Sequence, residues 1–158
     1  MANKLTRTQY VERYWKDAIE ACRGTGLFPS VMLAQGILES GNGNSSLSRD
    51  YHNHFGIKKG TGWTGRVVNL KTREVFDGKS TTIVDGFRVY ETSEQGFRDR
   101  NEFLKRNPRY SKAGVFTAKT PEEQIDALAR AGYATDPDYA RKLKSIINAS
   151  NLKRYDPQ

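Results

Sequence analysis

The apolar residues of this chain change their spacing twice, and this change restricts the fold more than any other feature. From Thr8 to Cys22 they occur at i, i+3, i+4, i+7, i+8 and i+11, the spacing of one helix face. Between residues 66 and 90 the spacing becomes two, which is typical of strands. Helical spacing returns after Glu91. The sequence therefore predicts an α+β fold, mainly α, with a small β hairpin in its middle.

Capping signals place the helix ends. Thr6 and Gln9 fit a capping box, and Pro29 suits the first turn of a second helix that is apolar nearly all round and should be buried. Ser, Gly and Asn residues at 40–46 end that helix. Asp77-Gly78 predicts the turn of the hairpin. Further helix starts are predicted at Thr92, Thr120 and Asp136-Pro137.

The length of 158 residues and the lack of a linker predict one domain over 1–158. Its β lobe should cover about 60–92, and residues from about 152 to 158 should form a frayed tail. The 17 aromatic residues are too many for a disordered chain, and no apolar run approaches the ~20 residues of a membrane span. Residues 1–7 lack the apolar stretch of a signal peptide.

Several kinds of site are disfavoured by the residues present. Cys22 is the single cysteine, so neither an internal disulfide nor a Cys-rich zinc site is possible. His52 and His54 lack a third ligand at a sensible spacing, and no phosphate-binding loop is found. We therefore expect no metal and no cofactor.

The net charge of +8 is concentrated in the middle of the chain. Residues 49–120 hold 15 Lys and Arg against 8 Asp and Glu. A basic region of this kind can attract nucleic acid, an anionic membrane or an anionic cell-wall polymer, or it can simply keep the protein soluble. Charge alone does not choose among these.

Glu39 is the strongest candidate for catalysis. It ends the most apolar helix, where loss of hydration should raise its pKa and suit it to act as a general acid. Gln35 lies one turn earlier on the same helix face, which makes it a candidate for substrate binding. The small residues at 40–46 would let a bulky substrate approach. The alternative is an ordinary glutamate at a helix end.

Glu74 shares a predicted strand face with Val68, Leu70 and Phe76, an unusual place for a carboxylate unless it lines a cleft. A pair of carboxylates is the general arrangement for glycoside hydrolysis. The alternative is an exposed hairpin residue whose register has been misassigned.

Three aromatic residues are candidates for sugar binding, because phenol and indole rings pack well on sugar faces. Tyr133 follows Gly132 between two predicted helices and could project into a cleft. Tyr139 could do the same or be a core residue of the last helix. Trp63 lies in a Gly-rich loop and is either a sugar platform or an anchor for that loop.

Five segments, in order and over roughly residues 8–150, resemble one family, the glycoside hydrolase family 73 endo-β-N-acetylglucosaminidases. Phe28–Gly41 resembles the catalytic helix, and Asn53–Lys58 resembles the Asn-x-Phe-Gly-Ile-Lys segment. Three further segments resemble the Thr-x-Glu strand, the aromatic-Arg-x-Tyr strand and the Gly-Tyr-Ala-Thr-Asp-Pro motif: Thr72–Gly78, Phe87–Tyr90 and Gly132–Ala140. Asn42 departs from the pattern, because the family usually has an aromatic residue there.

The resemblance implies a lysozyme-like fold, with a helical lobe, a small β-hairpin lobe and a groove between them. It implies cleavage of the β-1,4 bond between N-acetylglucosamine and N-acetylmuramic acid in peptidoglycan. Glu39 would be the general acid, Glu74 the proposed base, and Tyr133 a cleft tyrosine near Glu39. Asn53 is assigned to substrate binding. A mobile β lobe, or help from the acetamido group of the substrate, would provide an alternative to Glu74.

Two rival functions stay open. A muramidase or lytic transglycosylase shares the fold but cuts the other bond, and a non-catalytic basic module would only bind the cell wall. The expected partners are peptidoglycan glycan strands and possibly anionic wall polymers, with no nucleic acid, and the chain should be a monomer. It should act in the periplasm or the extracellular wall. The export route is open: a phage lysin, an injected toxin or a chain trimmed of its leader.

Overall fold

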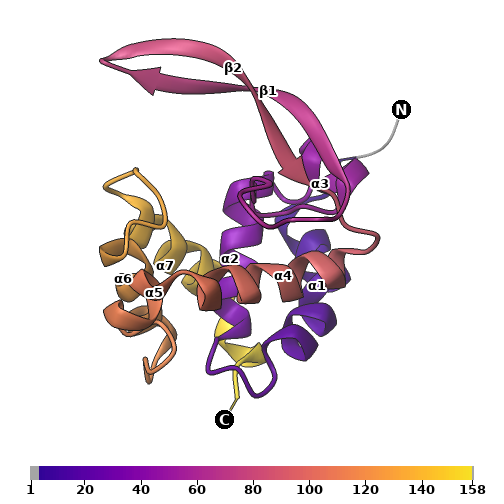
Figure 1. Ribbon diagram of the computed structural model, residues 1–158. Coiled ribbons are helices and arrows are strands. Elements are labelled where there is room, and N and C mark those ends of the chain that lie inside the picture. Colours follow the sequence, from indigo (N-terminus) through magenta and orange to yellow (C-terminus); the bar gives the residue numbers. More distant parts are fainter. Residues whose placement is uncertain (1–3, 158) are drawn as a thin grey trace.

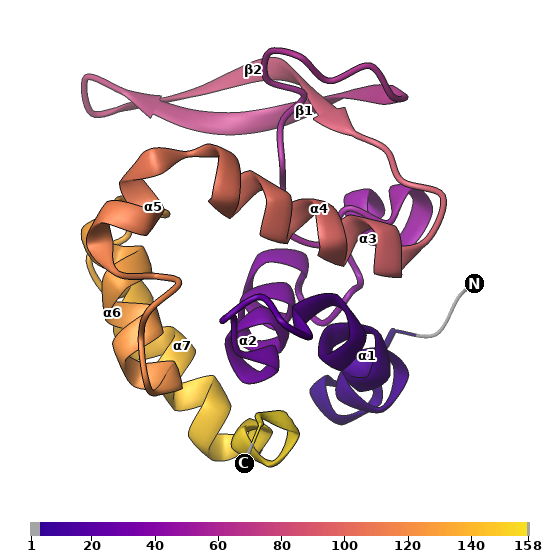
Figure 2. The ribbon, with the colours of Figure 1, turned by 60° about the horizontal axis from the view of Figure 1, so that its bottom comes forward.

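Helix α2 (Pro29–Ser40) runs through the centre of a helical lobe, surrounded by the other helices (Figure 2). Val31, Met32, Leu33 and Ala34 have no exposed surface, because α1, α6, α7 and the C-terminal turn pack around them. The predicted burial of this helix is confirmed. A helix that is apolar on all sides is stable in water only when it is enclosed in this way.

The computed structural model describes residues 4–157 (Figure 1). Helices α1 and α2 are followed by a short helix, the hairpin and four more helices. The elements besides α2 are α1 (Arg7–Cys22), α3 (Ser46–Tyr51), β1 (Val67–Phe76), β2 (Lys79–Arg88), α4 (Ser93–Arg106), α5 (Pro108–Ala113), α6 (Pro121–Arg130), α7 (Tyr139–Ala149) and the 3₁₀ turn η1 (Leu152–Tyr155).

The predicted fold class of a mainly helical chain with one hairpin is confirmed. Both partners of the capping box at α1 are in place, since Thr6 Oγ1 accepts from the Gln9 amide at 3.1 Å and Gln9 Oε1 from the Thr6 amide at 2.8 Å. Thr120 caps α6 through its side chain, which accepts from the Glu123 amide at 3.1 Å. No helix among the described residues is long and apolar enough to span a membrane.

The two strands form an antiparallel hairpin on one side of the helical lobe (Figures 1 and 2). Asp77 and Gly78 form its turn, and both have the positive φ angles, 50° and 75°, that tight hairpin turns require. Val68, Leu70, Thr72 and Glu74 are half-buried on one face, whereas their odd-numbered neighbours in β1 are exposed. The alternation predicted for β1 is therefore confirmed at these positions.

Three helices of the structure differ from what the sequence predicted. The six-residue helices α3 and α5 were not predicted, because they are too short to show a helical period. Helix α7 begins at Tyr139 and not at Asp136-Pro137, which instead form the preceding turn, where Asp136 Oδ1 accepts from the Asp138 amide at 2.9 Å.

The predicted frayed tail is wrong for residues 152–157, while Gln158 lies outside the described residues. Leu152 is fully buried, and Tyr155 stacks on Trp15 with ring centres 5.4 Å apart. The Asp156 carboxylate accepts from the Ser30 amide at 2.8 Å and from its hydroxyl at 2.6 Å. These long-range contacts fix the tail against α1 and the first turn of α2.

Candidate active site

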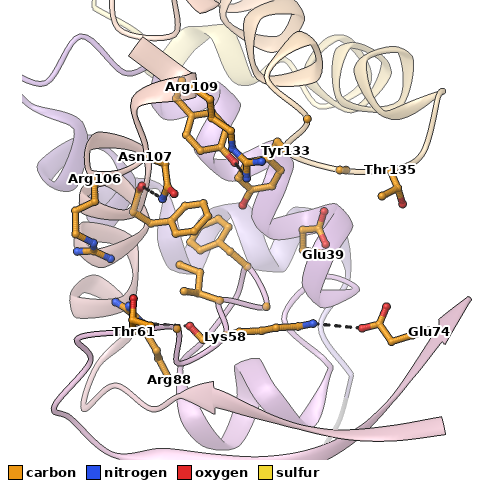
Figure 3. Close-up of a pocket in the computed structure, with 18 residues that line it drawn as sticks. Glu39, Lys58, Thr61, Glu74, Arg88, Arg106, Asn107, Arg109, Tyr133 and Thr135 are labelled. Carbon is orange, nitrogen blue, oxygen red and sulfur yellow. Dashed lines mark hydrogen bonds and ion pairs between the residues drawn. The ribbon is translucent and has the colours of Figure 1, made fainter. Parts of the chain in front are cut away.

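A groove of about 860 Å³ lies between the half-buried face of the hairpin and the helical lobe (Figure 3). Glu39 contributes from the end of α2 and Glu74 from β1. The loop 55–61, the end of α4, the start of α5 and the turn 132–135 complete its walls. Segments far apart in the sequence therefore meet around a single space.

Glu39 is exposed to this groove at the last turn of α2. Loss of hydration between the groove walls raises the pKa of its carboxyl, and a hydrogen bond from Tyr139 partly opposes the shift. The negative end of the α2 dipole lies at the same place and also disfavours the charged form. The position is thus suited to a protonated carboxyl that can reach a substrate in the groove.

The backbone after Glu39 is held in a defined turn. Gly41 has a φ of 58° and ends α2 in the left-handed region. Ser40 Oγ donates to the Gly36 carbonyl at 2.5 Å and accepts from the Gly43 amide at 2.7 Å. This turn fixes the small residues 41–43 directly after Glu39, and none of them lines the groove.

Gln35 and Tyr139 lie beneath Glu39 and do not line the groove, which corrects their assignment to substrate binding. Gln35 is fully buried and Tyr139 is 3% exposed. Gln35 Nε2 donates to the Tyr139 hydroxyl at 2.9 Å. Gln35 shares the helix face of Glu39 as predicted, but the packing of α7 closes that face one turn below the groove.

Tyr133 is a half-buried residue of the groove wall. Its ring stacks on that of Tyr139 at 5.8 Å between centres and at 17° between planes. Burial raises the pKa of its hydroxyl, against the opposing effect of the Arg100 cation. The phenol therefore stays neutral in any ordinary buffer and can both donate and accept a hydrogen bond.

Glu74 lies in the groove on the hairpin side, where Lys58 reaches toward it (Figure 3). Lys58 Nζ is 3.3 Å from Glu74 Oε1 and 2.9 Å from Asp85 Oδ2. One ammonium group thus binds a carboxylate from each strand. The structure places Glu39 and Glu74 in the same groove, on opposite lobes.

Asn53 and Trp63 serve the scaffold and do not line the groove. Asn53 is 1% exposed, and its amide binds the backbone of Ile57 and Arg88, so its predicted role in substrate binding is corrected to fixing the loop before β1. Trp63 Nε1 donates to the Arg66 carbonyl at 2.9 Å, and the Arg88 guanidinium lies 4.6 Å from its ring. The loop-anchor alternative describes Trp63 better than a sugar platform.

Sequence reasoning missed the basic residues of the groove. Lys58 lay within the Asn53–Lys58 segment, but no pattern linked it to Glu74. Arg106 and Arg109 line the groove from α4 and α5. They belong to the basic region of residues 49–120, and composition alone does not show which of its cations line a groove.

His54 is a buried histidine whose two ring nitrogens are both used in hydrogen bonds. His54 is 1% exposed, and its ring nitrogens pair with the Tyr10 hydroxyl at 2.8 Å and the Ser93 hydroxyl at 2.9 Å. Among residues 4–157, no three His, Cys, Asp or Glu side chains gather as a metal site would need.

A helical lobe, a two-stranded hairpin and a carboxylate on each side of the groove define the class of lysozyme-like glycoside hydrolases. Residues 15–152 match the glucosaminidase family model, described as mannosyl-glycoprotein endo-beta-N-acetylglucosaminidase. The chain belongs to this family. The predicted lysozyme-like fold and the predicted family are both confirmed.

Relatives cover almost all of this chain. A probable N-acetylmuramidase of Lactococcus lactis subsp. cremoris is 42% identical over 93% of the chain and 34% of its own length. The peptidoglycan hydrolase FlgJ of Salmonella typhimurium is 41% identical over 80% of the chain and 41% of its own length. The chain thus spans about a third to two fifths of the length of these relatives.

Among solved structures, the catalytic domain of the autolysin Auto from Listeria monocytogenes superimposes with a TM-score of 0.84 at 33% identity. The match covers 99% of this chain and 91% of that domain. The whole arrangement of helices and hairpin is therefore shared with a catalytic domain.

Proposed function

We propose that this chain is an endo-β-N-acetylglucosaminidase that hydrolyses the β-1,4 bond between N-acetylglucosamine and N-acetylmuramic acid in peptidoglycan. One observation carries the proposal: Glu39, a carboxyl with a raised pKa, faces a groove of about 860 Å³ that also contains Glu74. Membership of the glucosaminidase family supports the bond, and the name of FlgJ as a peptidoglycan hydrolase supports the substrate.

In the proposed reaction, Glu39 donates its proton to the glycosidic oxygen as the bond from that oxygen to C1 of N-acetylglucosamine breaks. A general acid must be protonated at the working pH, and the raised pKa of Glu39 favours that form. Charge develops on the sugar ring as an oxocarbenium ion. The leaving N-acetylmuramic acid departs with a free 4-hydroxyl group.

Glu74 is the proposed base. It would accept a proton from the water that attacks C1, from the side of the groove opposite Glu39. Carboxylates on opposite walls leave room for that water, as in inverting glycosidases. Lys58, by binding Glu74 and Asp85 together, would hold the base in the groove.

Tyr133 would position the sugar beside Glu39. Its half-buried ring forms part of the groove wall, and its hydroxyl is neutral. A phenol in this position can pack on the sugar face and hydrogen-bond to a substituent. The stack with Tyr139 restricts the ring to one orientation.

The rival enzyme function is a muramidase or lytic transglycosylase, and the name of the Lactococcus relative favours a muramidase. Mass spectrometry of digested peptidoglycan separates the three. Products ending in reducing N-acetylglucosamine support our proposal. Reducing N-acetylmuramic acid would establish a muramidase, and anhydro-muramic ends a transglycosylase; either result overturns it.

A non-catalytic wall-binding module is the second rival, favoured by the basic residues in the groove. It predicts that Glu39→Gln keeps every function of the chain. We expect instead that the variant binds peptidoglycan but no longer lyses it.

We further propose that the chain acts on the wall in the periplasm or outside the cell, as a monomer. The net charge of +8 would also draw it to anionic wall polymers, an attraction that salt should weaken. Binding to nucleic acid is not part of the proposal, because the groove combines cations with carboxylates.

A further inference from the structure

The charges in the groove are separated along its length. Arg88 and Arg106 lie at the side of the pocket away from Glu39 and Glu74 (Figure 3). At the carboxylate end, Lys58 is balanced by both Glu74 and Asp85, which leaves one net negative charge before Glu39 is counted. An uncharged sugar chain gains little from such a polarity, whereas a charged substituent would be oriented by it.

The basic end has more cations than anions. Among the described residues, Asp99 is the one carboxylate that pairs with these cations, with Arg88 at 3.0 Å and with Arg106 at 3.7 Å. Arg88 is 6% exposed and committed to that pair, but Arg106 keeps 46% of its side chain exposed. One carboxylate therefore pairs with two guanidinium groups. The more accessible of these, that of Arg106, makes the longer ion pair.

Arg109 is a second available cation, on the part of the groove wall that carries Tyr133 (Figure 3). Its Nη2 donates to the Tyr110 hydroxyl at 2.9 Å, and its guanidinium lies 4.9 Å from the ring centre of that buried tyrosine. Within residues 4–157 no carboxylate pairs with it. Contact with Tyr110 fixes the guanidinium at the groove wall while most of its donors stay free.

We propose that Arg106 and Arg109, which line the groove from α4 and α5, form an anion-binding wall for the free carboxylates of the stem peptide carried by N-acetylmuramic acid. This inference rests on the proposed function and names the form of its substrate: glycan that still bears its peptides. The sugar backbone of peptidoglycan is uncharged, so the stem peptide supplies the anion. Arginine suits this role because its planar fork pairs with a carboxylate through two hydrogen bonds.

The test compares two substrates, both free of teichoic acid: glycan strands with intact stem peptides, and the same strands after an amidase has removed the peptides. Release of reducing ends gives kcat/KM for each. We expect Arg106→Gln/Arg109→Gln to lose about fivefold to tenfold on peptide-bearing strands, as expected for two exposed ion pairs, and to be unchanged on stripped strands. Equal loss on both substrates, or loss on neither, would overturn the inference.

Matched controls separate the anion-binding wall from general charge and from folding. Lys105→Gln and Lys112→Gln remove neighbouring cations of α4 and α5 that do not line the groove, and they should leave the substrate preference unchanged. Arg106→Gln alone avoids the contact between Arg109 and Tyr110, and it should show part of the selective loss even if the double variant is unstable. If the wild-type chain cuts neither substrate, the proposed function has failed; if it cuts both without preference, only the anion-binding wall has failed.

Discussion

The side-chain oxygen of Gln35 accepts two hydrogen bonds from the guanidinium of Arg100, from Nε at 3.0 Å and from Nη2 at 2.6 Å. Both residues are fully buried beneath Glu39. Among the described residues no carboxylate pairs with Arg100, and burial lowers the pKa of its guanidinium. A neutral amide thus solvates a buried cation, and through its own NH₂ group it also fixes Tyr139.

Replacing Gln35 with Leu should therefore destabilise the chain strongly. The substitution leaves a buried guanidinium short of acceptors, which costs about 3 kcal/mol or more. Urea denaturation measures the loss in free energy of unfolding. Glu102→Gln, on the exposed face of the same helix as Arg100, is the control and should change little. A loss below about 1 kcal/mol for Gln35→Leu would show that water reaches Arg100.

Replacing Glu39 with Gln should lower kcat by about 10²–10⁴-fold, the usual contribution of a general acid. The side chain keeps its size but loses its transferable proton. Circular dichroism should show an unchanged fold, and binding to peptidoglycan should persist. Activity within tenfold of wild type would remove Glu39 from the mechanism.

Glu39→Gln should also change how the free energy of unfolding depends on pH. The pKa of Glu39 is higher in the folded chain than its usual 4.5, so the folded state holds the proton more tightly than the unfolded state. Stability from this group is present at low pH and falls as pH rises through the folded pKa. As the pH rises from 4 to 7, wild type should therefore lose free energy of unfolding that Glu39→Gln does not lose, by an amount set by the difference between the folded and unfolded pKa of Glu39. Thermal melts at both pH values test this, and a parallel pH dependence of the two proteins would contradict it.

Replacing Lys58 with Met should impair activity more than stability. Its two ion pairs are partly exposed, with 53% of the lysine side chain accessible, so their loss costs about 1 kcal/mol or less. Glu74 would lose the contact that holds it in the groove, and kcat should fall about tenfold or more. Lys58→Arg should restore part of the rate. Unchanged kcat in Lys58→Met would show that Glu74 needs no such partner.

His54 should make the helical lobe sensitive to acid. Burial lowers its pKa from 6.5 to about 3, so the folded state stays neutral while the unfolded chain takes up a proton. Stability is therefore complete above pH 6.5 and is lost as pH falls toward 3. Between pH 7 and 5, wild type should lose about 2 kcal/mol more than His54→Gln, measured by urea denaturation. Equal losses would mean that His54 titrates normally.

The sequence by itself determined the architecture. Local signals decide where helices begin and how a strand alternates, so Thr6, Pro29, Thr120 and Asp77-Gly78 predicted elements that the structure confirms. The raised pKa of Glu39 was also predictable, because its position at the end of a helix that is apolar nearly all round already implies poor hydration. These features depend on neighbours within a few residues, which a sequence displays directly.

Only the tertiary structure decided which polar side chains face the groove. Gln35, Asn53 and Tyr139 looked like binding residues, yet packing of distant segments buries them and uses their hydrogen bonds internally. Conversely, Lys58 meets Glu74 across 16 residues, and α4 and α5 bring Arg106 and Arg109 into the walls of the same groove. Such long-range contacts depend on how the two lobes pack against each other, which cannot be inferred from the spacing of residues along the chain.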